Sequence, residues 1–202
     1  MVVIKKEYNK GRVILVFEDG SKSIELSKAV VYDQKISVGT NLNEDELYNL
    51  SLISEKKRAY NRALYYISKS NMSSGHLKTK LNGKFLDEAV EYAVNKVLEN
   101  RFIDDRDYAI NLSSRLQSEG RSKKEIQEKM YYKGVKKDDI EEALSLLEFD
   151  EEADILSLIN KKYKQKLFGE NGEQKVAASL MRRGFSPFLV KKIIKQELNK
   201  ND

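Results

Sequence analysis

Cysteine is absent from the 202-residue chain, and proline occurs only once. Without cysteine the chain can form no disulfide and offers no thiolate to a metal ion, which is compatible with a reducing cytoplasm. The scarcity of proline, together with a 34% content of charged residues, favours a mostly helical protein with much exposed helix surface.

Long apolar runs are also missing. No run approaches the roughly 18 residues that a membrane-spanning helix needs, and the opening residues, MVVIKKEYNKG, lack the apolar segment of a signal peptide. We therefore expect a cytoplasmic protein that does not enter a membrane. Hydrophobic residues make up 40% of the chain and aromatic residues 9%, which supports a packed core rather than disorder.

Residues typical of catalysis are scarce as well. The only histidine, His76, falls three positions after Ser73 in the first turn of a predicted helix. A surface or capping-turn role is expected there, because no nucleophile or metal ligand lies near it. No G-x-x-x-x-G-K-[ST] motif is present, and the GENG at 169–172 is too isolated to cradle a phosphate. The sequence predicts no enzyme, no cofactor and no metal site.

The net charge of +5 is unevenly distributed. Residues 56–102 carry ten Lys and Arg against four Asp and Glu, and residues 151–202 carry eleven against seven, whereas 1–55 and 103–150 are net acidic. Basic blocks favour phosphate backbones or acidic protein surfaces. The acidic block between them argues against one continuous nucleic-acid stripe.

Strand patterns open the chain. Three runs with β-branched residues are separated by NKG and EDGS, which are turn sequences, and predict a three-stranded antiparallel meander. Residues 28–42 stay ambiguous between short strands and an extended connection. A helix is predicted over NEDELYNLSLIS, with Asn43 as its N-cap and Glu46 at N3. The three runs occupy residues 2–8, 12–17 and 21–27.

From about residue 56 the pattern is helical and repeats three times. The segments 76–90, 125–140 and 175–190 share apolar positions at a spacing of 49 or 50 residues. Each unit reads as three helices with one apolar stripe per helix. A unit this small buries little surface alone, so neighbouring units are expected to stack. The helices are predicted at about 57–70, 74–83 and 86–99, then 104–119, 122–133 and 137–148, then 151–167, 173–183 and 187–199.

Helix start and stop signals support these boundaries. Ser122 with Glu125 matches a capping box. Gly134 and Gly184 occupy the position after a helix where glycine is favoured, and Ser186-Pro187 reads as an N-cap followed by proline at the first helical position.

The sequence thus predicts a mainly α protein, with three tandem three-helix repeats in a curved solenoid-like array after a small antiparallel β-rich N-terminal segment. The expected divisions are 1–55 for the β-meander plus a short helix, 56–103 for repeat 1, 104–149 for repeat 2 and 150–202 for repeat 3.

The stretch FIDDRDYA, residues 102–109, holds three carboxylates within four positions. Such a group could bind a metal or act in acid/base chemistry, but a metal site needs more oxygen ligands from elsewhere. Asp104 directly precedes a helical pattern and Asp107 lies three residues on, which suits an N-cap followed by first-turn acids. We interpret the stretch as a helix start, with Phe102 and Ile103 as apolar anchors that end the previous unit.

This stretch and the repeat spacing together resemble the RecX family of regulatory proteins. In that family an apolar pair, two acidic residues and an x-x-aromatic-Ala tail open the second repeat, here Phe102 to Ala109. The run S-x-x-E-I-x-x-K-M-x-x-K-G, here Ser122 to Gly134, matches the second helix of that repeat. The likeness covers residues 56–200, and the β extension resembles that of RecX proteins from Gram-positive bacteria. The sequence departs from the family at a shorter turn in repeat 1 and at the loop KLFGENGEQK in repeat 3.

The resemblance implies a non-enzymatic modulator of the RecA recombinase. Family members bind the RecA filament on single-stranded DNA, limit its growth, and so dampen ATP hydrolysis, strand exchange and SOS co-protease activity. The expected partners are a RecA-type filament and the single-stranded DNA within it, and the expected state is a monomer.

Two other functions stay open. One is a helical DNA-binding transcriptional regulator, because three-helix units can resemble helix-turn-helix modules. Three similar units, rather than one reader plus a dimerisation domain, disfavour it. The other is a scaffold that binds no nucleic acid.

Basic residues form the candidate interface. Lys84, Lys133 and Arg183 hold the same repeat position at the end of the second helix, and stacked units would place them in a row facing DNA phosphates or an acidic filament surface. Cations near a helix C-terminus are also ordinary, since they complement the helix dipole. Tyr131 and Tyr132 flank this row, where packing is favoured over base stacking. The candidate residues are Lys80, Lys84, Lys129, Lys133, Arg182, Arg183, and, on the last helix, Lys191, Lys192 and Lys195.

Overall fold

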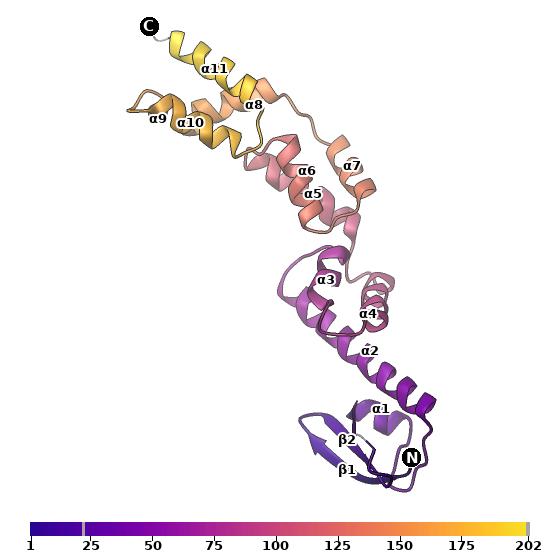
Figure 1. Cartoon of the computed structure of the whole chain (residues 1–202). Helices are drawn as coiled ribbons and strands as arrows, with labels where there is room; N and C mark the ends of the chain where they lie inside the picture. The colour runs from indigo at the N-terminus through magenta and orange to yellow at the C-terminus, as the bar shows by residue number, and fades with distance from the viewer. Residues whose placement is uncertain (22, 201–202) are drawn as a thin grey trace. The chain divides into compact units, whose positions relative to one another are not determined.

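The computed structural model of the chain describes residues 1–21 and 23–200 (Figure 1). The chain forms two compact units, Met1–Ile103 and Asp104–Asp202. Lys22, in the third predicted strand, and residues 201–202, at the end of the third predicted repeat, lie outside the described residues. In the part of the chain that is described, no helix is long and apolar enough to span a membrane.

The first unit begins with the predicted antiparallel meander, in the order β1-β2-β3. Alternation along β2 places Val13 and Leu15 in the core. The turn between the first two strands contains Lys10 and Gly11, both with positive φ, as the favoured two-residue hairpin requires. The strands are β1 (Val3–Asn9), β2 (Arg12–Phe17) and β3 (Ile24–Ser27).

Residues 28–33 form a short helix, α1 (Lys28–Asp33), so both alternatives predicted for this stretch are wrong. Its β-branched residues favour a strand by propensity. The hydroxyl of Ser27 nevertheless accepts a hydrogen bond from the N–H of Val30. Val30 and Val31 are buried in the same hydrophobic core as the side chains of the sheet. Capping and tertiary burial therefore override propensity. Beyond α1 the chain makes turns at residues 34–35 and 38–39, and Asn41 then pairs with Val2 in an isolated antiparallel bridge.

Helix α2 (Glu44–Lys69) has 26 residues and joins two helices that were predicted separately. It begins with the predicted capping box, in which the side chains of Asn43 and Glu46 each accept the backbone N–H of the other at 2.8 Å. Leu47 packs in the core of the sheet, whereas Ala59 belongs to the core of the helices that follow. The expected boundary between the β segment and the first repeat therefore falls inside one helix.

Two shorter helices complete the first unit, α3 (Ser74–Leu81) and α4 (Asp87–Glu99). They lie beside the C-terminal half of α2 (Figure 1). Of the two anchors expected at the end of this unit, only Ile103 is buried, and Phe102 is 53% exposed. The prediction for Phe102 is wrong because two adjacent residues after a helix end point in different directions, so one alone reaches the core.

The second unit contains the remaining predicted helices, with ends within about three residues of the predicted ones. The long first helix of repeat 3 is divided, because a π-helical turn, η1 (Ile159–Tyr163), separates α8 from α9. The mainly helical fold with a small N-terminal sheet is thus confirmed, and the curved stack of three repeats stays a prediction. The helices are α5 (Asp105–Ser118), α6 (Lys123–Tyr132), α7 (Lys137–Ser145), α8 (Glu151–Leu158), α9 (Lys164–Leu167), α10 (Gly172–Met181) and α11 (Pro187–Asn199).

The apolar positions shared by the three repeats lie in the cores. In the second unit, α5 to α7 enclose one hydrophobic cluster and α8 to α11 enclose another. The apolar positions that recur in the sequence are therefore buried in the structure. Shared positions with no exposed surface include Leu77, Ile126 and Val176, and Leu81, Met130 and Leu180.

The predicted capping box at the start of α6 forms only in part. Ser122 Oγ accepts the N–H of Glu125 at 3.2 Å. The Glu125 carboxylate binds Arg121 at 2.7 Å instead of the Ser122 backbone. The Ser122 N–H donates to the carbonyl of Arg183 at 3.0 Å, which links the start of α6 to the end of α10. The backbone carbonyl of Arg183, in repeat 3, thus accepts the N–H that the glutamate side chain accepts in a complete capping box.

Candidate nucleic-acid and partner interface

The acidic stretch at the start of α5 is a helix cap. Asp104 Oδ1 accepts the N–H of Asp107 at 2.9 Å, and Asp105 and Asp107 lie in the first turn, where they complement the helix dipole. Among residues 1–21 and 23–200, no group of three or more His, Asp or Glu side chains is placed to hold a metal ion. The hydrogen bond from the Asp107 N–H to Asp104 confirms the capping interpretation.

Replacing Asp104 with alanine is expected to lower the free energy of unfolding of the second unit by about 1 kcal/mol, because the Asp107 N–H loses its acceptor. The matched variant Asp104→Asn keeps a side-chain acceptor and should cost less. Urea unfolding followed by circular dichroism measures both. A rise in stability of the wild-type protein on adding Mg²⁺, absent in Asp104→Asn, would contradict the capping role.

The only histidine is a turn residue. The His76 N–H donates to Ser73 Oγ at 3.0 Å, so His76 lies in the first turn of α3, as expected. The side chain is half-buried.

The nine candidate basic residues fall in both units. Lys80 and Lys84 belong to the first unit, and the other seven to the second. The row formed by Lys84, Lys133 and Arg183 stays a prediction. Within each unit, however, the contacts of these side chains differ sharply.

Arg183 is bound on three sides by its own unit. Its Nη1 donates to the carbonyls of Glu119 at 2.5 Å and Gly120 at 3.1 Å, and its Nε donates to the Tyr163 hydroxyl at 3.2 Å. These acceptors lie at the end of α5 and in η1. The geometry favours a structural role, because most of the guanidinium donors that a phosphate would need are engaged.

Two other cations of the second unit are also partnered. Lys192 binds Glu152 at 2.8 Å. In repeat 2 the matching positions hold the pair Arg106–Glu142, with the charges exchanged. Both repeats thus have an ion pair at this place, with the acid and the base on opposite helices. The pair is best explained as a link between the first and third helix of its repeat, and at such exposure it contributes at most about 1 kcal/mol to stability. Lys129 binds Glu125 at 3.6 Å.

Lys191 and Lys195 differ from Lys192. Both are exposed on α11, and neither forms an ion pair with any residue in 1–21 or 23–200. Arg182 is exposed too, and its Nε donates weakly to the carbonyl of Ala178 at 3.3 Å. These three residues are the cations of the predicted set in this unit best placed to meet a partner.

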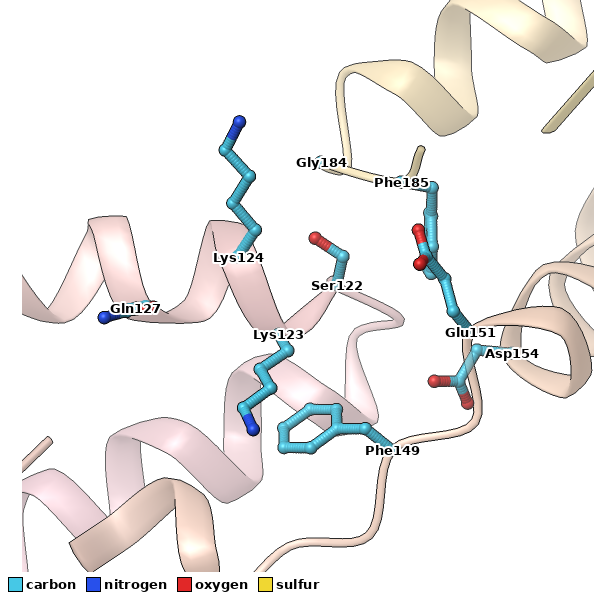
Figure 2. A pocket seen from close by; sticks show the side chains of 9 residues that line it. All are labelled: Ser122, Lys123, Lys124, Gln127, Phe149, Glu151, Asp154, Gly184 and Phe185. Carbon is cyan, nitrogen blue, oxygen red and sulfur yellow. The ribbon is translucent and has the colours of Figure 1, made fainter. Parts of the chain in front are cut away.

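A groove in the second unit lies between α6 and the turn that joins α10 to α11 (Figure 2). It encloses about 410 Å³. Figure 2 shows Lys123 turned toward the ring of Phe149, at 5.6 Å, and Lys124 turned away. On the opposite wall Glu151 accepts the N–H of Ser186 at 2.6 Å.

Acidic residues shape the electrostatics of this groove. Burial, and then the charges of Asp150 and Glu151, raises the pKa of Asp154. Because carboxylates share the groove with the lysines, it does not suit a phosphate chain.

The first unit contains a denser basic site, around two adjacent tyrosines. The Nζ atoms of Lys80 and Lys84 lie 5.4 and 5.2 Å from the ring centre of Tyr66. The Arg62 guanidinium lies 5.5 Å from the ring of Tyr65 and 5.9 Å from that of Tyr66. The Lys69 Nζ lies 5.6 Å from the ring centre of Tyr65. We name this the tyrosine cluster: Arg62, Tyr65, Tyr66, Lys69, Lys80 and Lys84.

Helix geometry assembles the tyrosine cluster. Arg62, Tyr65, Tyr66 and Lys69 are spaced i, i+3, i+4 and i+7 on α2, so they share one face. Lys80 comes from the last turn of α3 and Lys84 from the turn after it. The sequence had indicated Lys80 and Lys84 but not the α2 residues, although the spacing in RALYYISK was a visible signal.

Tyr66 is the centre of the cluster. Lys84 Nζ donates to its hydroxyl at 2.8 Å. This hydrogen bond, and then the positive charges of Lys84, Arg62 and Lys80, lowers the pKa of the Tyr66 phenol. Lys84 and Arg183 occupy the same repeat position and both bind a tyrosine hydroxyl of the first helix of their repeat, but Lys84 remains exposed.

Known proteins are similar to the chain over more than nine-tenths of its length. The chain is 29% identical over 198 residues to the regulatory protein RecX of Clostridium botulinum (strain Eklund 17B / Type B). The alignment covers 95% of the chain and 92% of that protein. The chain is 26% identical over 190 residues to the regulatory protein RecX of Clostridioides difficile (strain 630), covering 91% and 89%. No family model matches the chain.

Two solved structures share the fold. A crystal structure of a regulatory protein RecX superposes with a TM-score of 0.60 at 23% identity, over 95% of this chain and 98% of that one. The structure of RecX from Lactobacillus salivarius gives a TM-score of 0.54 at 22% identity, over 70% of this chain and 96% of that one.

Proposed function

The chain belongs to the RecX family of regulatory proteins, and we propose that it regulates a RecA-type recombinase by binding the filament which that recombinase forms on single-stranded DNA. The observation that carries the proposal is the match to RecX regulatory proteins over more than nine-tenths of the chain.

The proposed action is non-enzymatic. The protein binds the filament and limits its extension, and as a result ATP hydrolysis, strand exchange and co-protease activity of the recombinase fall. Supporting observations are the exposed cations in each unit that have no carboxylate partner among the described residues, because a filament on DNA presents phosphates and acidic protein surface. A monomer is the proposed active state.

Addition of the protein to RecA, ATP and long single-stranded DNA is expected to suppress ATP hydrolysis, with the protein retained on sedimented filaments. The matched control is duplex DNA without RecA, where binding should be weaker at the same salt concentration. Tight binding to duplex DNA combined with unchanged ATP hydrolysis would contradict the proposal and favour a transcriptional regulator. Binding to neither would favour a scaffold.

A further inference from the structure

We propose that the tyrosine cluster of the first unit binds single-stranded DNA directly, with Tyr65 stacking on a base and the surrounding cations holding the adjacent phosphates. The inference deepens the proposed function, and it rests on that function only in taking DNA, rather than RNA, as the nucleic acid. The site lies within the first unit, so the argument does not depend on the row of basic residues across repeats.

The first argument is charge. None of the four cations, Arg62, Lys69, Lys80 and Lys84, forms an ion pair with a residue in 1–21 or 23–200. Four other lysines of the same unit each bind a carboxylate, and these are Lys56, Lys57, Lys78 and Lys96. The cluster therefore brings four cations without ion pairs to described residues around two aromatic rings, where an anion would relieve the mutual repulsion.

The second argument is the exposure of the two rings. Tyr65 is 51% exposed, whereas Tyr66 is half-buried, with its hydroxyl engaged by Lys84. The ring centres lie 6.0 Å apart at an angle of 57°. Tyr66 thus holds Lys84 in place, and Tyr65 offers its exposed ring surface to a partner. Flat aromatic faces beside cations bind the unpaired bases of a single strand, and a duplex keeps its base faces stacked inside.

Cations flank Tyr65 along α2. Arg62 lies one helical turn before it and Lys69 one turn after it, with both within 5.6 Å of the ring. A base stacked on Tyr65 would therefore have a cation on each side for its flanking phosphates. Tyr92, which is 40% exposed, has one cation near its ring in the described part of the chain, Lys56 at 5.9 Å, and that lysine is paired with Glu88. Tyr132 is 85% exposed and Phe188 76%, and neither has a cation over its ring within the described part of the chain.

The test uses the full chain without recombinase and a fluorescent oligo-dT, with binding measured by anisotropy across a range of salt concentrations. Tyr65→Ala is expected to weaken binding about tenfold, and Tyr65→Phe, which keeps the ring, to bind within about twofold of wild type. Lys69→Gln and Lys80→Gln should each reduce the slope of log affinity against log salt by about 0.7, the value for one lost phosphate contact on a single strand.

Two matched controls come from the same chain. Tyr132→Ala removes a more exposed ring for which the described part of the chain gives no cation over the ring, and Lys78→Gln removes a lysine of α3 that is paired with Glu91. Both should bind oligo-dT like wild type. Because all substituted side chains lie at the surface, circular dichroism and the unfolding midpoint should stay unchanged, and the Tyr65→Phe variant separates stacking from any effect on folding.

Three results would overturn the inference. One is that Tyr65→Ala and the two lysine variants all bind oligo-dT with wild-type affinity. Another is that the two control variants lose as much affinity for oligo-dT as these variants do. The third is unchanged oligo-dT binding in variants that have lost filament binding, which would assign the cluster to an acidic protein surface. The failures are distinguishable, because suppression of RecA ATP hydrolysis by wild-type protein tests the proposed function even when oligo-dT binding fails.

Discussion

Replacing Gly184 with alanine is expected to lower the free energy of unfolding of the second unit by about 2–5 kcal/mol. Gly184 follows α10 with a φ of +81°, where a β-carbon alone costs about 1–2 kcal/mol. That carbon would also stand 2.5 Å from Ser122 Oγ and 2.9 Å from Glu125 Cβ. Ser122 cannot easily move, since it caps α6 and donates its N–H to Arg183. Overpacking of this kind adds about 1–3 kcal/mol.

The matched control is Gly83→Ala in the first unit. Gly83 has a similar φ of +74°, but a β-carbon there would meet no atom within 4 Å. Only the backbone cost remains, so a loss of about 1 kcal/mol is expected. Urea unfolding gives both values, and amide hydrogen exchange assigns each loss to its unit. Equal losses in the two variants would show that α6 and the end of α10 do not approach as closely as the structure places them.

Most of the fold could be predicted because its elements are defined by local patterns. Alternation predicted the strands, three-and-four spacing predicted the helices, and the glycine after α10 predicted where that helix ends. The errors arose where tertiary contacts determine the local structure. One helix was predicted as two because the repeat pattern begins at about residue 56. No glycine or proline interrupts α2 (Glu44–Lys69), however, so the stretch that packs on the sheet continues into the stretch that packs on α3 and α4. The same holds for α1, a helix stabilised by burial against strand-like propensity.

The candidate site was predictable only in part. Lys80 and Lys84 were found from the repeat, but Tyr65 and Tyr66 were not among the candidate residues. Their role depends on neighbours from another helix, which periodicity does not identify. The pairing of lysines was equally hidden, because the carboxylate that binds Lys192 lies 40 positions away, at Glu152. A basic residue is available to a partner only when no such carboxylate reaches it, and that is a property of the folded chain.

Replacing Arg183 with methionine is expected to lower the free energy of unfolding of the second unit by about 2–3 kcal/mol, although the side chain looks like one more surface cation in the sequence. Its guanidinium spans the carbonyls of Glu119 and Gly120 and the hydroxyl of Tyr163. Hydrogen bonds from a charged donor contribute about 1.5–3 kcal/mol, and their loss leaves partly buried acceptors without a donor. Arg183→Lys should recover little, because one ammonium cannot reach the positions that the planar fork occupies.

Arg182→Met is the matched control for Arg183, since the two arginines are adjacent and Arg182 is exposed with only weak bonds to its own helix. Its cost should stay within about 0.5 kcal/mol. This contrast decides how the predicted basic row can be tested: reversing the charge at Arg183 would confound folding with binding, whereas Lys84 can be reversed at the surface. If Arg183→Met unfolds like wild type and loses only filament binding, the residue belongs to the interface and its contacts with Glu119 and Gly120 are incidental.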